Sequence, residues 1–536
     1  MAARRRPGRG LALAALLGAT LAVLAYDAVL SSYRYPYSGD SASYIDMAGA
    51  LLREGRPLVT PWDVDPGDRD AVPQPLFPPG FPALIAALTP LTGDVRTAAL
   101  VPGRVAAALL PFLIVVLFRG AVADGALAAV AALALLSQGV RDWHFLAYSD
   151  VPALALAVLA LGLLARGLGL AGGAGPRAAG ALALAGLAAG IGYTVRNAGL
   201  AVLAASLATL GYARLRGLGP RRAPLYWLAG ASAPLAALIA YNLATFGRLQ
   251  PYDMPQSTRR WPLNLGDYAV AQLDDLGLPD RLLALLPPWL AVLSIAAVAA
   301  LFAAAFWRLR REPARQGLVV LLGGYCGAGA LLLVASRSRY EWGNFIDSRN
   351  VLQYTFAYGL GLAVAAGALC GPRGRRYAAL AGALLLVSLL AAAVRDVHAA
   401  RGYHQETWLA LSEDRAVMSA ARELPANALI ASNAAVLFRL GVPRPVRELE
   451  LGGGDDDFVV ELGALTRAAA GRRPTAFLLV CDEWTTGFSA CGARPRSAAA
   501  GPACTRVRGQ PPLVLLCEAP PAAGVREPAP GREPAR

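Results

Sequence analysis

The sequence predicts an all-α polytopic membrane bundle of about eleven transmembrane helices, followed by a small C-terminal α/β domain outside the membrane. Three observations carry this prediction. Of the 536 residues, 56% are hydrophobic and only 16% are charged, which is too apolar for a soluble globular protein. Long runs of Ala, Leu, Gly and Val recur as far as residue 395. Beyond that point, charged residues return within the pattern.

The first apolar run extends from Leu11 to about Leu30, and a bilayer core requires roughly 20 such residues. Four arginines precede it, which places the N-terminus in the cytoplasm. A cleaved signal peptide is the alternative. The length of the run and the many spans after it favour a retained helix. Residue 31 and its successors are therefore expected outside.

Further spans are expected at 98–118, 122–140, 149–166, 178–194, 197–214, 224–245, 285–307, 316–335, 349–370 and 376–394. Arginines gather in every second connection, whereas the opposite loops are longer and mixed in sign. This alternation predicts a multi-pass protein of the cell inner (plasma) membrane. The net charge of +14 comes from arginine and indicates this orientation. No basic patch interleaved with aromatic residues suggests a nucleic-acid partner.

Three domains are expected. Residues 1–395 form the transmembrane domain, with a large first outer loop at 31–97. Residues 396–520 form an extracytoplasmic α/β domain, and residues 521–536 form a disordered tail rich in Pro, Gly, Arg and Glu. Short buried strands are predicted at Leu429–Ser432, Ala476–Val480 and Leu513–Leu516.

Two helices are predicted within the first outer loop. Ser41–Glu54 has apolar residues at helical spacing, and Gly55 is a plausible end. Pro78–Leu88 follows a proline cluster and is too short to span the bilayer, so it suits a helix in the interface.

The cysteines separate into two groups. Cys326 and Cys370 lie in apolar spans and are expected to be packing residues. The other four lie in the tail domain, where an oxidising compartment favours one or two disulfides of undetermined connectivity. Zinc is the competing interpretation, but the spacing lacks a CxxC pair. These four are Cys481, Cys491, Cys504 and Cys517.

Asp40 lies in the polar segment Tyr37–Met47, directly after the first span. One interpretation is an N-cap of the helix that follows. A carboxylate at the membrane surface can also take a proton from a hydroxyl or amine nucleophile. The two roles are compatible, and we predict that Asp40 is a catalytic base. Asp46 lies about 240° from Asp40 around the helix, at ~100° per residue, and matches no motif.

Asp150 is expected at the outer mouth of the fourth span, with Pro152 in the first turn of that helix. It can be an N-cap. An acid at this depth is costly without a partner, which favours a functional role. Asp40 and Asp150 lie on the same predicted side of the membrane. They can form an acid/base pair or share a divalent ion.

Two arginines break the rule that cations stay inside. Arg196 lies at the outer junction between two spans, and Arg349 lies beside Asp347 at the start of the tenth. Snorkelling explains the first and an ion pair with Asp347 explains the second. The functional interpretation is a clamp for phosphate, since the guanidinium fork matches its oxygens.

Three further residues are weaker candidates for substrate binding. Arg259 and Arg260 form a basic pair in a long outer loop, where such pairs are often simply solvated. His144 stands between Trp143 and Phe145, which favours a structural or interfacial role over a catalytic one.

In order and spacing these motifs resemble the GT-C superfamily of polytopic glycosyltransferases, near its bacterial protein O-mannosyltransferase and aminoarabinose transferase group. The resemblance covers roughly residues 10–395. The carrying motifs are Gly39-Asp-Ser-Ala-Ser-Tyr44, Phe77-Pro-Pro-Gly-Phe-Pro82, Ser149-Asp-Val-Pro152, Arg196-Asn-Ala-Gly-Leu200 and Ile346-Asp-Ser-Arg349.

The resemblance implies an inverting transfer from a polyprenyl-phosphate sugar to a lipid, glycan or protein acceptor at the outer face. Asp40 matches the family's first-loop acid and Asp150 its second, and Tyr44 belongs to the first motif as a substrate-binding residue. Arg196 and Arg349 would neutralise the leaving phosphate. The sequence has Ser41 where the mannosyltransferase pattern has another acid, which leaves the acceptor chemistry open.

The resemblance implies no obligatory cofactor, although some relatives use a divalent metal. A transporter or flippase for a lipid-linked sugar is the main alternative, because several outer arginines and two acids in a bundle suit an anionic lipid equally well. A polymer ligase of similar architecture is the third hypothesis.

Overall fold

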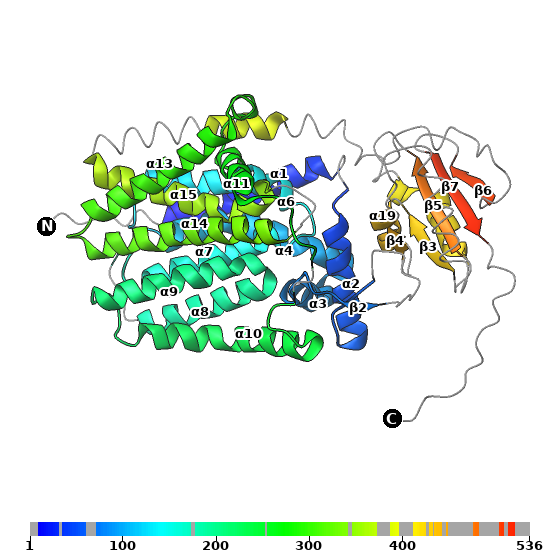
Figure 1. Cartoon of the computed structure of the whole chain (residues 1–536), viewed down its shortest axis with the longest axis horizontal. Helices are drawn as coiled ribbons and strands as arrows, with labels where there is room; N and C mark the ends of the chain where they lie inside the picture. Colours follow the sequence, from blue (N-terminus) through cyan, green and yellow to red (C-terminus); the bar gives the residue numbers. More distant parts are fainter. Residues whose placement is uncertain are drawn as a thin grey trace. The chain divides into compact units, whose positions relative to one another are not determined.

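The computed structural model describes residues 9–31, 35–60, 71–172, 177–251, 254–340, 346–371, 386–395, 411–424, 428–432, 434–441, 446–448, 475–481, 503–508 and 513–519 (Figure 1). The chain forms two compact units. The first unit contains residues 1–30, 47–57 and 74–399, and the second contains 31–46, 58–73 and 400–536. The second unit therefore takes in parts of the first outer loop that the sequence assigned to the transmembrane domain.

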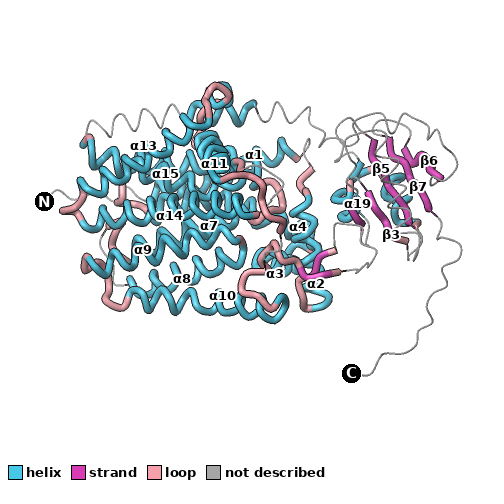
Figure 2. Tube along the Cα trace, in the orientation of Figure 1, coloured by secondary structure: helices cyan, strands magenta, loops and turns pink. Residues whose placement is uncertain are grey.

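Long helices build the first unit, as the tubes in Figure 2 show. Within the described residues, nine helices are long and apolar enough to cross a membrane, which confirms a polytopic bundle. They are α1 (Arg9–Leu30), α4 (Val95–Leu117), α7 (Asp150–Gly167), α8 (Ala178–Val195), α9 (Leu200–Leu215, after the 3-10 turn η1 at Asn197–Gly199), α10 (Ala223–Phe246), α13 (Pro288–Arg308), α14 (Pro313–Arg339) and α15 (Ser348–Leu369).

Two predicted spans differ from this set. The segment predicted at 122–140 forms α5 (Asp124–Leu136), and Ser137 then turns the chain into α6 (Gln138–Trp143). The Ser137 hydroxyl accepts a hydrogen bond from the Val140 N–H at 3.4 Å, so it caps the new helix and shortens the old one. Of the span predicted at 376–394, only Leu386–Arg395 belongs to the described residues, as a short apolar helix.

Small residues allow α8 and α10 to pack closely. A Cβ added at Gly186 would lie 1.9 Å from the Trp227 carbonyl oxygen, and one added at Gly230 would lie 1.8 Å from that of Ala183. Both obstacles are backbone atoms, which cannot move aside as a side chain can. Close backbone approach at small residues is typical of helices that associate within lipid.

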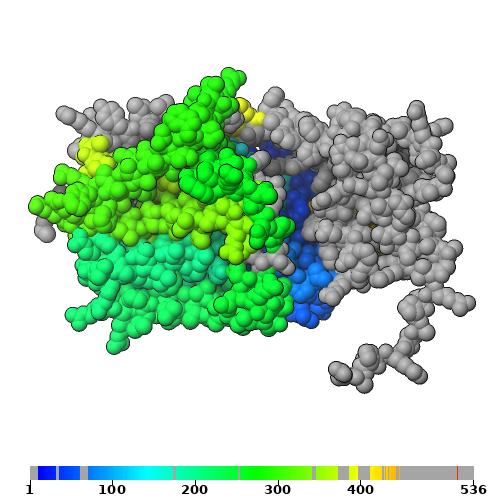
Figure 3. Space-filling view, in the orientation of Figure 1, coloured from blue at the N-terminus to red at the C-terminus, as the bar shows by residue number. Residues whose placement is uncertain are grey.

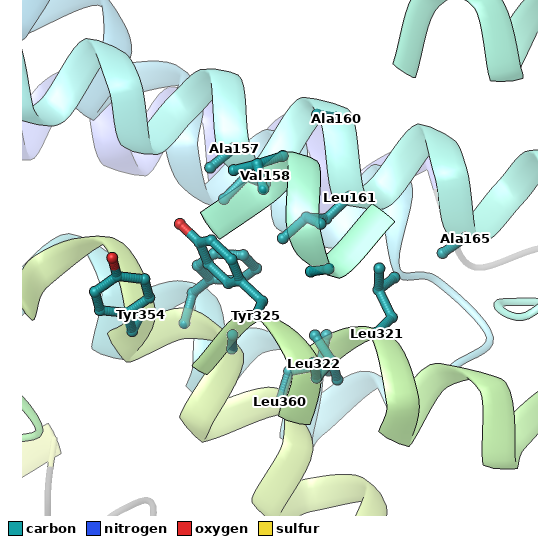
Figure 4. Packing of buried hydrophobic residues seen from close by; sticks show 14 of the residues in the cluster. Ala157, Val158, Ala160, Leu161, Ala165, Leu321, Leu322, Tyr325, Tyr354 and Leu360 are labelled. Atoms are coloured by element: carbon teal, nitrogen blue, oxygen red, sulfur yellow. The ribbon is translucent and has the colours of Figure 1, made fainter. Parts of the chain in front are cut away.

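A layer of buried apolar residues, mostly aliphatic, packs between α7, α14 and α15 (Figure 4). The rings of Tyr325 and Tyr354 lie beside each other with centroids 5.1 Å apart. Cys326 is buried, as predicted for a packing residue. Cys370 is exposed just after the end of α15, so the same prediction is wrong there.

Large apolar side chains are also exposed on the outside of the bundle. The visible face of the first unit in Figure 3 is formed by the cyan and green segments, which include α8–α10, α13 and α14. Leucines on these helices are more than half exposed, as at Leu184, Leu207 and Leu293. Such apolar exposure is typical of surfaces that contact lipid.

The outer loops contain shorter helices. α2 (Gly39–Glu54) and α3 (Gly80–Thr92) agree with the two predicted in the first loop, and α11 (Trp261–Asp275) and α12 (Asp280–Leu283) lie in the second. Gly55 follows α2 with φ of 69°, a conformation that glycine adopts without strain. A two-stranded pairing joins β1 (Leu58–Val59) to β2 (Val72–Pro73).

A mixed sheet forms the described centre of the second unit, with strand order β4-β3-β5-β7-β6. The three predicted strands are confirmed as β3 (Leu429–Ser432), β5 (Thr475–Cys481) and β7 (Leu513–Ala519). β4 (Val446–Glu448) pairs parallel to β3, and β6 (Ala503–Arg508) pairs antiparallel to β7. Helices α18 (Arg415–Glu423) and α19 (Ala435–Gly441) accompany the sheet. Cys504 and Cys517 are register partners, while Cys491 and the tail at 521–536 lie outside the described residues.

Candidate active site

Asp150 is the first residue of α7 and is completely buried. Its Oδ1 atom lies 2.7 Å from Nη2 of Arg196, and Nε of Arg349 lies 3.3 Å from Oδ1 and 3.2 Å from Oδ2. We call Asp150, Arg196 and Arg349 the arginine clamp. The N-cap residue of α7 is Ser149, and its side chain makes no capping hydrogen bond to the helix. The Ser149 hydroxyl instead accepts a hydrogen bond from Nη1 of Arg196 at 3.3 Å. The N-cap interpretation of Asp150 is therefore wrong.

Two aromatic rings hold Arg349 from the side. Its guanidinium carbon lies 4.2 Å from the ring centroid of Tyr148 and 5.3 Å from that of Trp143. The two rings are themselves 5.1 Å apart. A guanidinium over aromatic faces gains cation–π energy and loses rotational freedom. Arg349 is thus fixed in orientation before any ligand arrives.

Glycine at position 139 brings α6 against the start of α15. A Cβ added there would lie 2.4 Å from the Leu352 Cβ and 2.7 Å from the Ser348 carbonyl oxygen. The Gly139 N–H also donates to the Asp275 carboxylate at 2.6 Å. This contact places Trp143, at the end of α6, beside Arg349.

Asp347 begins α15 through a reciprocal cap. Its carboxylate accepts from the Asn350 N–H, and the Asn350 side chain accepts from the Asp347 N–H. Burial raises the pKa of Asp347, and the Arg349 guanidinium opposes that shift. The cap fixes the first turn of α15, and with it the backbone from which Arg349 extends.

Within the clamp, one carboxylate faces two guanidinium groups, and the Asp347 carboxylate also acts on Arg349. Arg196 uses only two of its five N–H groups within the described residues, one toward Asp150 and one toward Ser149. Its side chain is 18% exposed. Arg196 can therefore donate to an anionic oxygen without leaving Asp150.

His144 belongs to a second buried cluster. Its Nε2 lies 3.0 Å from the Asp27 carboxylate, and its Nδ1 lies 2.7 Å from the Val140 carbonyl oxygen. Arg104 also binds Asp27, at 2.8 Å. Both ring nitrogens are engaged, which favours the structural role for His144 over the substrate-binding role. In the sequence, the feature that indicates this buried cluster is Asp27, an acidic residue within the first apolar run.

The weaker arginine candidates make other contacts. Nη2 of Arg259 contacts both carboxylate oxygens of Asp267, at 2.9 and 2.7 Å. Arg260 is exposed and precedes α11. Their assignment to substrate binding stays a prediction, and it gains no support from these contacts.

Asp40 and Tyr44 belong to the second unit. α2 begins at Gly39, so Asp40 lies in the first turn and not at the residue before the helix. Tyr44 follows one turn later on the same face and is buried. The catalytic role of Asp40 and its pairing with Asp150 stay predictions.

Sequence reasoning missed two carboxylates. Asp275 is fully buried at the end of α11, where it accepts hydrogen bonds from Gly139 and from the Thr355 hydroxyl. Burial raises the pKa of Asp275 to about 6. Asp46, which matched no motif, accepts from the Thr60 N–H at 3.2 Å and from Nη2 of Arg439 at 2.7 Å within the second unit.

Within the described part of the chain, no group of three His, Cys, Asp or Glu side chains could hold a metal ion. The clamp itself contains one carboxylate and two cations, a donor set that does not suit a divalent cation.

No protein-family model and no curated protein matches the chain. Among solved structures, ArnT from Cupriavidus metallidurans bound to undecaprenyl phosphate matches 96% of this chain and 98% of its own, with TM-score 0.56 and 13% identity. The chain has the GT-C fold. Apo AglB oligosaccharyltransferase from Archaeoglobus fulgidus shares this GT-C fold over 90% of this chain and 72% of its own, with TM-score 0.54 and 12% identity. Mycobacterial arabinofuranosyltransferase AftD matches 94% of this chain and 40% of its own, with TM-score 0.50 and 15% identity.

Proposed function

We propose that the protein is a membrane glycosyltransferase that moves a sugar from a polyprenyl-phosphate donor to an acceptor at the outer face of the cytoplasmic membrane. The observation that carries this proposal is the arginine clamp, two guanidinium groups held on one buried carboxylate. The GT-C fold supports it, because ArnT was solved with undecaprenyl phosphate.

The clamp suits the charge change of such a transfer. A polyprenyl-phosphate sugar is a phosphodiester with one negative charge. When the bond from the anomeric carbon to the phosphate oxygen breaks, the departing polyprenyl phosphate gains a second charge. The guanidinium group of Arg196 would stabilise that developing charge, and fixed donors act more strongly in a water-excluded site than in water. Arg196 has the uncommitted N–H groups to make this contact.

Asp150 acts in this proposal as a positioning residue. It is buried between two cations, and both of its oxygens are engaged by Arg196 and Arg349. Its carboxylate sets the separation and direction of Arg196 and Arg349. Breaking such a buried arrangement from one side leaves unpaired charge.

Asp40 is the proposed base, with Tyr44 one turn away as a substrate-binding residue. Asp40 would take the proton of the acceptor nucleophile as that nucleophile attacks the anomeric carbon opposite the phosphate. Attack from the opposite side gives inversion. A lipid, glycan or protein acceptor fits this chemistry, and no metal is required by it.

The proposed site lies on the outer side of a multi-pass inner-membrane protein, with the N-terminus inside. The apolar helices and exposed leucines support membrane insertion. The charge alternation in the sequence supports the orientation.

A transfer assay tests the proposal. Purified protein in lipid nanodiscs is supplied with labelled polyprenyl-phosphate sugars and with a membrane extract as the source of acceptor. We expect label to leave the donor, and we expect Asp40→Asn to reduce this by at least a hundredfold, the lower range for a general base. If no donor supports transfer, while reconstituted vesicles move the lipid-linked sugar across the bilayer, the protein is a transporter. Transfer of preassembled polymer alone would indicate a ligase.

A further inference from the structure

The last two strands of the second unit place two cysteines opposite each other. β6 pairs antiparallel with β7, and Cys504 of β6 is the register partner of Cys517 of β7. The register is continuous through this pair, from Ala503 to Arg506, and the shift in the ladder lies beyond it, between Arg506 and Arg508. The juxtaposition of the two cysteines is therefore a property of the backbone pairing itself.

This pairing gives the spacing that a disulfide needs. Register partners in an antiparallel ladder have Cα atoms about 4.5 or 5.5 Å apart, according to whether the pair exchanges backbone hydrogen bonds. Disulfides join cysteines whose Cα atoms are roughly 4.4–6.8 Å apart, so both kinds of pair lie within the range. Directly opposite residues also have their Cβ atoms on the same face of a sheet. A bond between Cys504 and Cys517 therefore matches the existing ladder.

The same register excludes Cys481 as a partner for either cysteine. Cys481 is the last residue of β5 and pairs with Leu513, the first residue of β7. Cys517 lies four residues further along β7, which is roughly 14 Å at about 3.4 Å per residue. Cys504 is opposite Cys517, at the same distant end of the strand. Cysteines whose Cα atoms are more than about 7 Å apart cannot be bridged without backbone movement.

The separation also bears on the alternative of a zinc site built from the four cysteines of this unit. A structural zinc ion binds each sulfur at about 2.3 Å, so all four ligands must meet at one point. Cys481 lies too far along the sheet to join Cys504 and Cys517 at such a point. The register is therefore incompatible with a zinc site that uses all four.

A link at this position would act on a strand at the edge of the sheet. Within the described sheet, β6 is the outermost strand and pairs with β7 alone (Figure 1). The bond would close a loop of about 15 residues, for which the chain-entropy model gives a shift of roughly a hundredfold in the unfolding equilibrium. An edge strand held by one neighbour gains most from such a constraint.

From these observations we infer that Cys504 and Cys517 form a disulfide that fastens β6 to β7. As the S–S bond forms, the two thiols lose two protons and two electrons. A protein thiol oxidoreductase accepts them when its own disulfide becomes two thiols. Such oxidants act outside the cytoplasm, where the sequence predicts this part of the chain. The inference depends on that location and not on the proposed transfer reaction, and it selects one pairing among those that the sequence leaves open.

Disulfide mapping on the full chain tests the inference. Cells are lysed in iodoacetamide, which blocks free thiols, and the purified protein is digested with trypsin without reduction and analysed by mass spectrometry. Cleavage after arginine separates Cys504, in peptide 497–506, from Cys517, in peptide 509–526. We expect these two peptides to be joined, with the loss of two hydrogen atoms. Cys370 is exposed and free, so it is the internal control and should carry the blocking group.

Two mapping results would overturn the inference. One is iodoacetamide on both Cys504 and Cys517. The other is a link from either of them to peptide 473–496, which contains Cys481 and Cys491.

Substitutions measure what the bond does for the strand. Cys504→Ser, Cys517→Ser and the double variant should all undergo limited proteolysis of the second unit about tenfold to a hundredfold faster than wild type, and equally so, because each removes the same bond. Cys370→Ser is the matched control and should be cleaved as wild type is. A thiol reductant should accelerate cleavage of the wild type and leave the double variant unchanged. Losses that add in the double variant, or wild-type cleavage that ignores the reductant, would contradict a bond between these two cysteines.

Discussion

The guanidinium carbon of Arg349 lies 4.2 Å from the centre of the Tyr148 ring, while its Nε contacts Asp150 at 3.2 Å. Arg349 is therefore held on two sides by residues that lie together in the chain, at the start of α7. We predict that Tyr148→Leu reduces sugar transfer about thirtyfold, because a desolvated cation–π contact contributes roughly 2 kcal/mol. Tyr148→Phe keeps the ring and should stay within about threefold of wild type. Equal losses in both variants, measured as kcat/KM for the donor, would contradict a role for the ring face.

The pH dependence of sugar transfer distinguishes the proposed roles of Asp40 and Asp150. We predict that Asp150→Asn lowers kcat at every pH without removing the acidic limb of the pH–rate profile. The substitution disturbs the positions of the two arginines, but it removes no group that transfers a proton. Asp40→Asn should lose kcat together with that limb, as expected of a general base. Profiles of kcat from pH 4.5 to 8.5 for both variants check this. An acidic limb that disappears in Asp150→Asn would make Asp150 the base.

Because Asp275 is buried, we expect an unusual pH dependence of the protein's free energy of unfolding. Its pKa is raised to about 6 in the folded protein, from an ordinary value of 3.8, by burial. The Thr355 hydroxyl, the Gly139 N–H and Arg141 oppose the rise, and Asp142 adds to it. Between these two pKa values the folded state binds more protons than the unfolded state, so this group lowers stability as pH rises from about 4 to 6. Above about pH 6, ionised Asp275 lowers the free energy of unfolding by roughly 3 kcal/mol in total.

Asp275→Asn removes this cost, because the amide stays neutral and its oxygen can still accept from Gly139. We predict that the variant gains thermal stability relative to wild type as pH rises from 4 to 7, and matches it near pH 4. Apparent melting temperatures in one detergent, scanned over pH, provide the measurement. A difference that does not vary with pH would contradict the account.

The fold and part of the site follow from the sequence for physical reasons. Apolar runs near 20 residues leave few options besides membrane helices, and Arg196 and Arg349 stood out because cations on the outer side are unusual. Their meeting at Asp150 joins residues 46 and 199 positions apart, which no local pattern encodes. Trp143 and Tyr148 looked like ordinary interfacial aromatics. Asp275 looked like a polar residue at a helix end, and only its burial marks it.

The ion pair of Asp46 with Arg439 ties the first part of α2 to the C-terminal part of the second unit. Arg439 is 2% exposed at the side chain and also donates to the Thr60 carbonyl oxygen. We predict that Arg439→Leu accelerates limited proteolysis of the second unit at least tenfold, because it leaves Asp46 without its cation and breaks a largely buried pair. Arg415→Leu, at an exposed position on α18, is the matched control. Equal cleavage rates in the two variants would show that the pair is dispensable.

Binding of polyprenyl phosphate tests the central claim most directly, because it isolates the clamp from the chemistry of transfer. The dissociation constant for undecaprenyl phosphate is measured in nanodiscs for wild type, Arg196→Gln, Arg349→Gln and Arg281→Gln. Loss of one charge-assisted contact should weaken binding about tenfold to a hundredfold in the first two variants, while Arg281→Gln, at an exposed arginine of α12 outside the clamp, should bind as wild type does. Unchanged binding in Arg196→Gln and Arg349→Gln, or equal weakening in Arg281→Gln, would contradict the assignment of the phosphate to the arginine clamp.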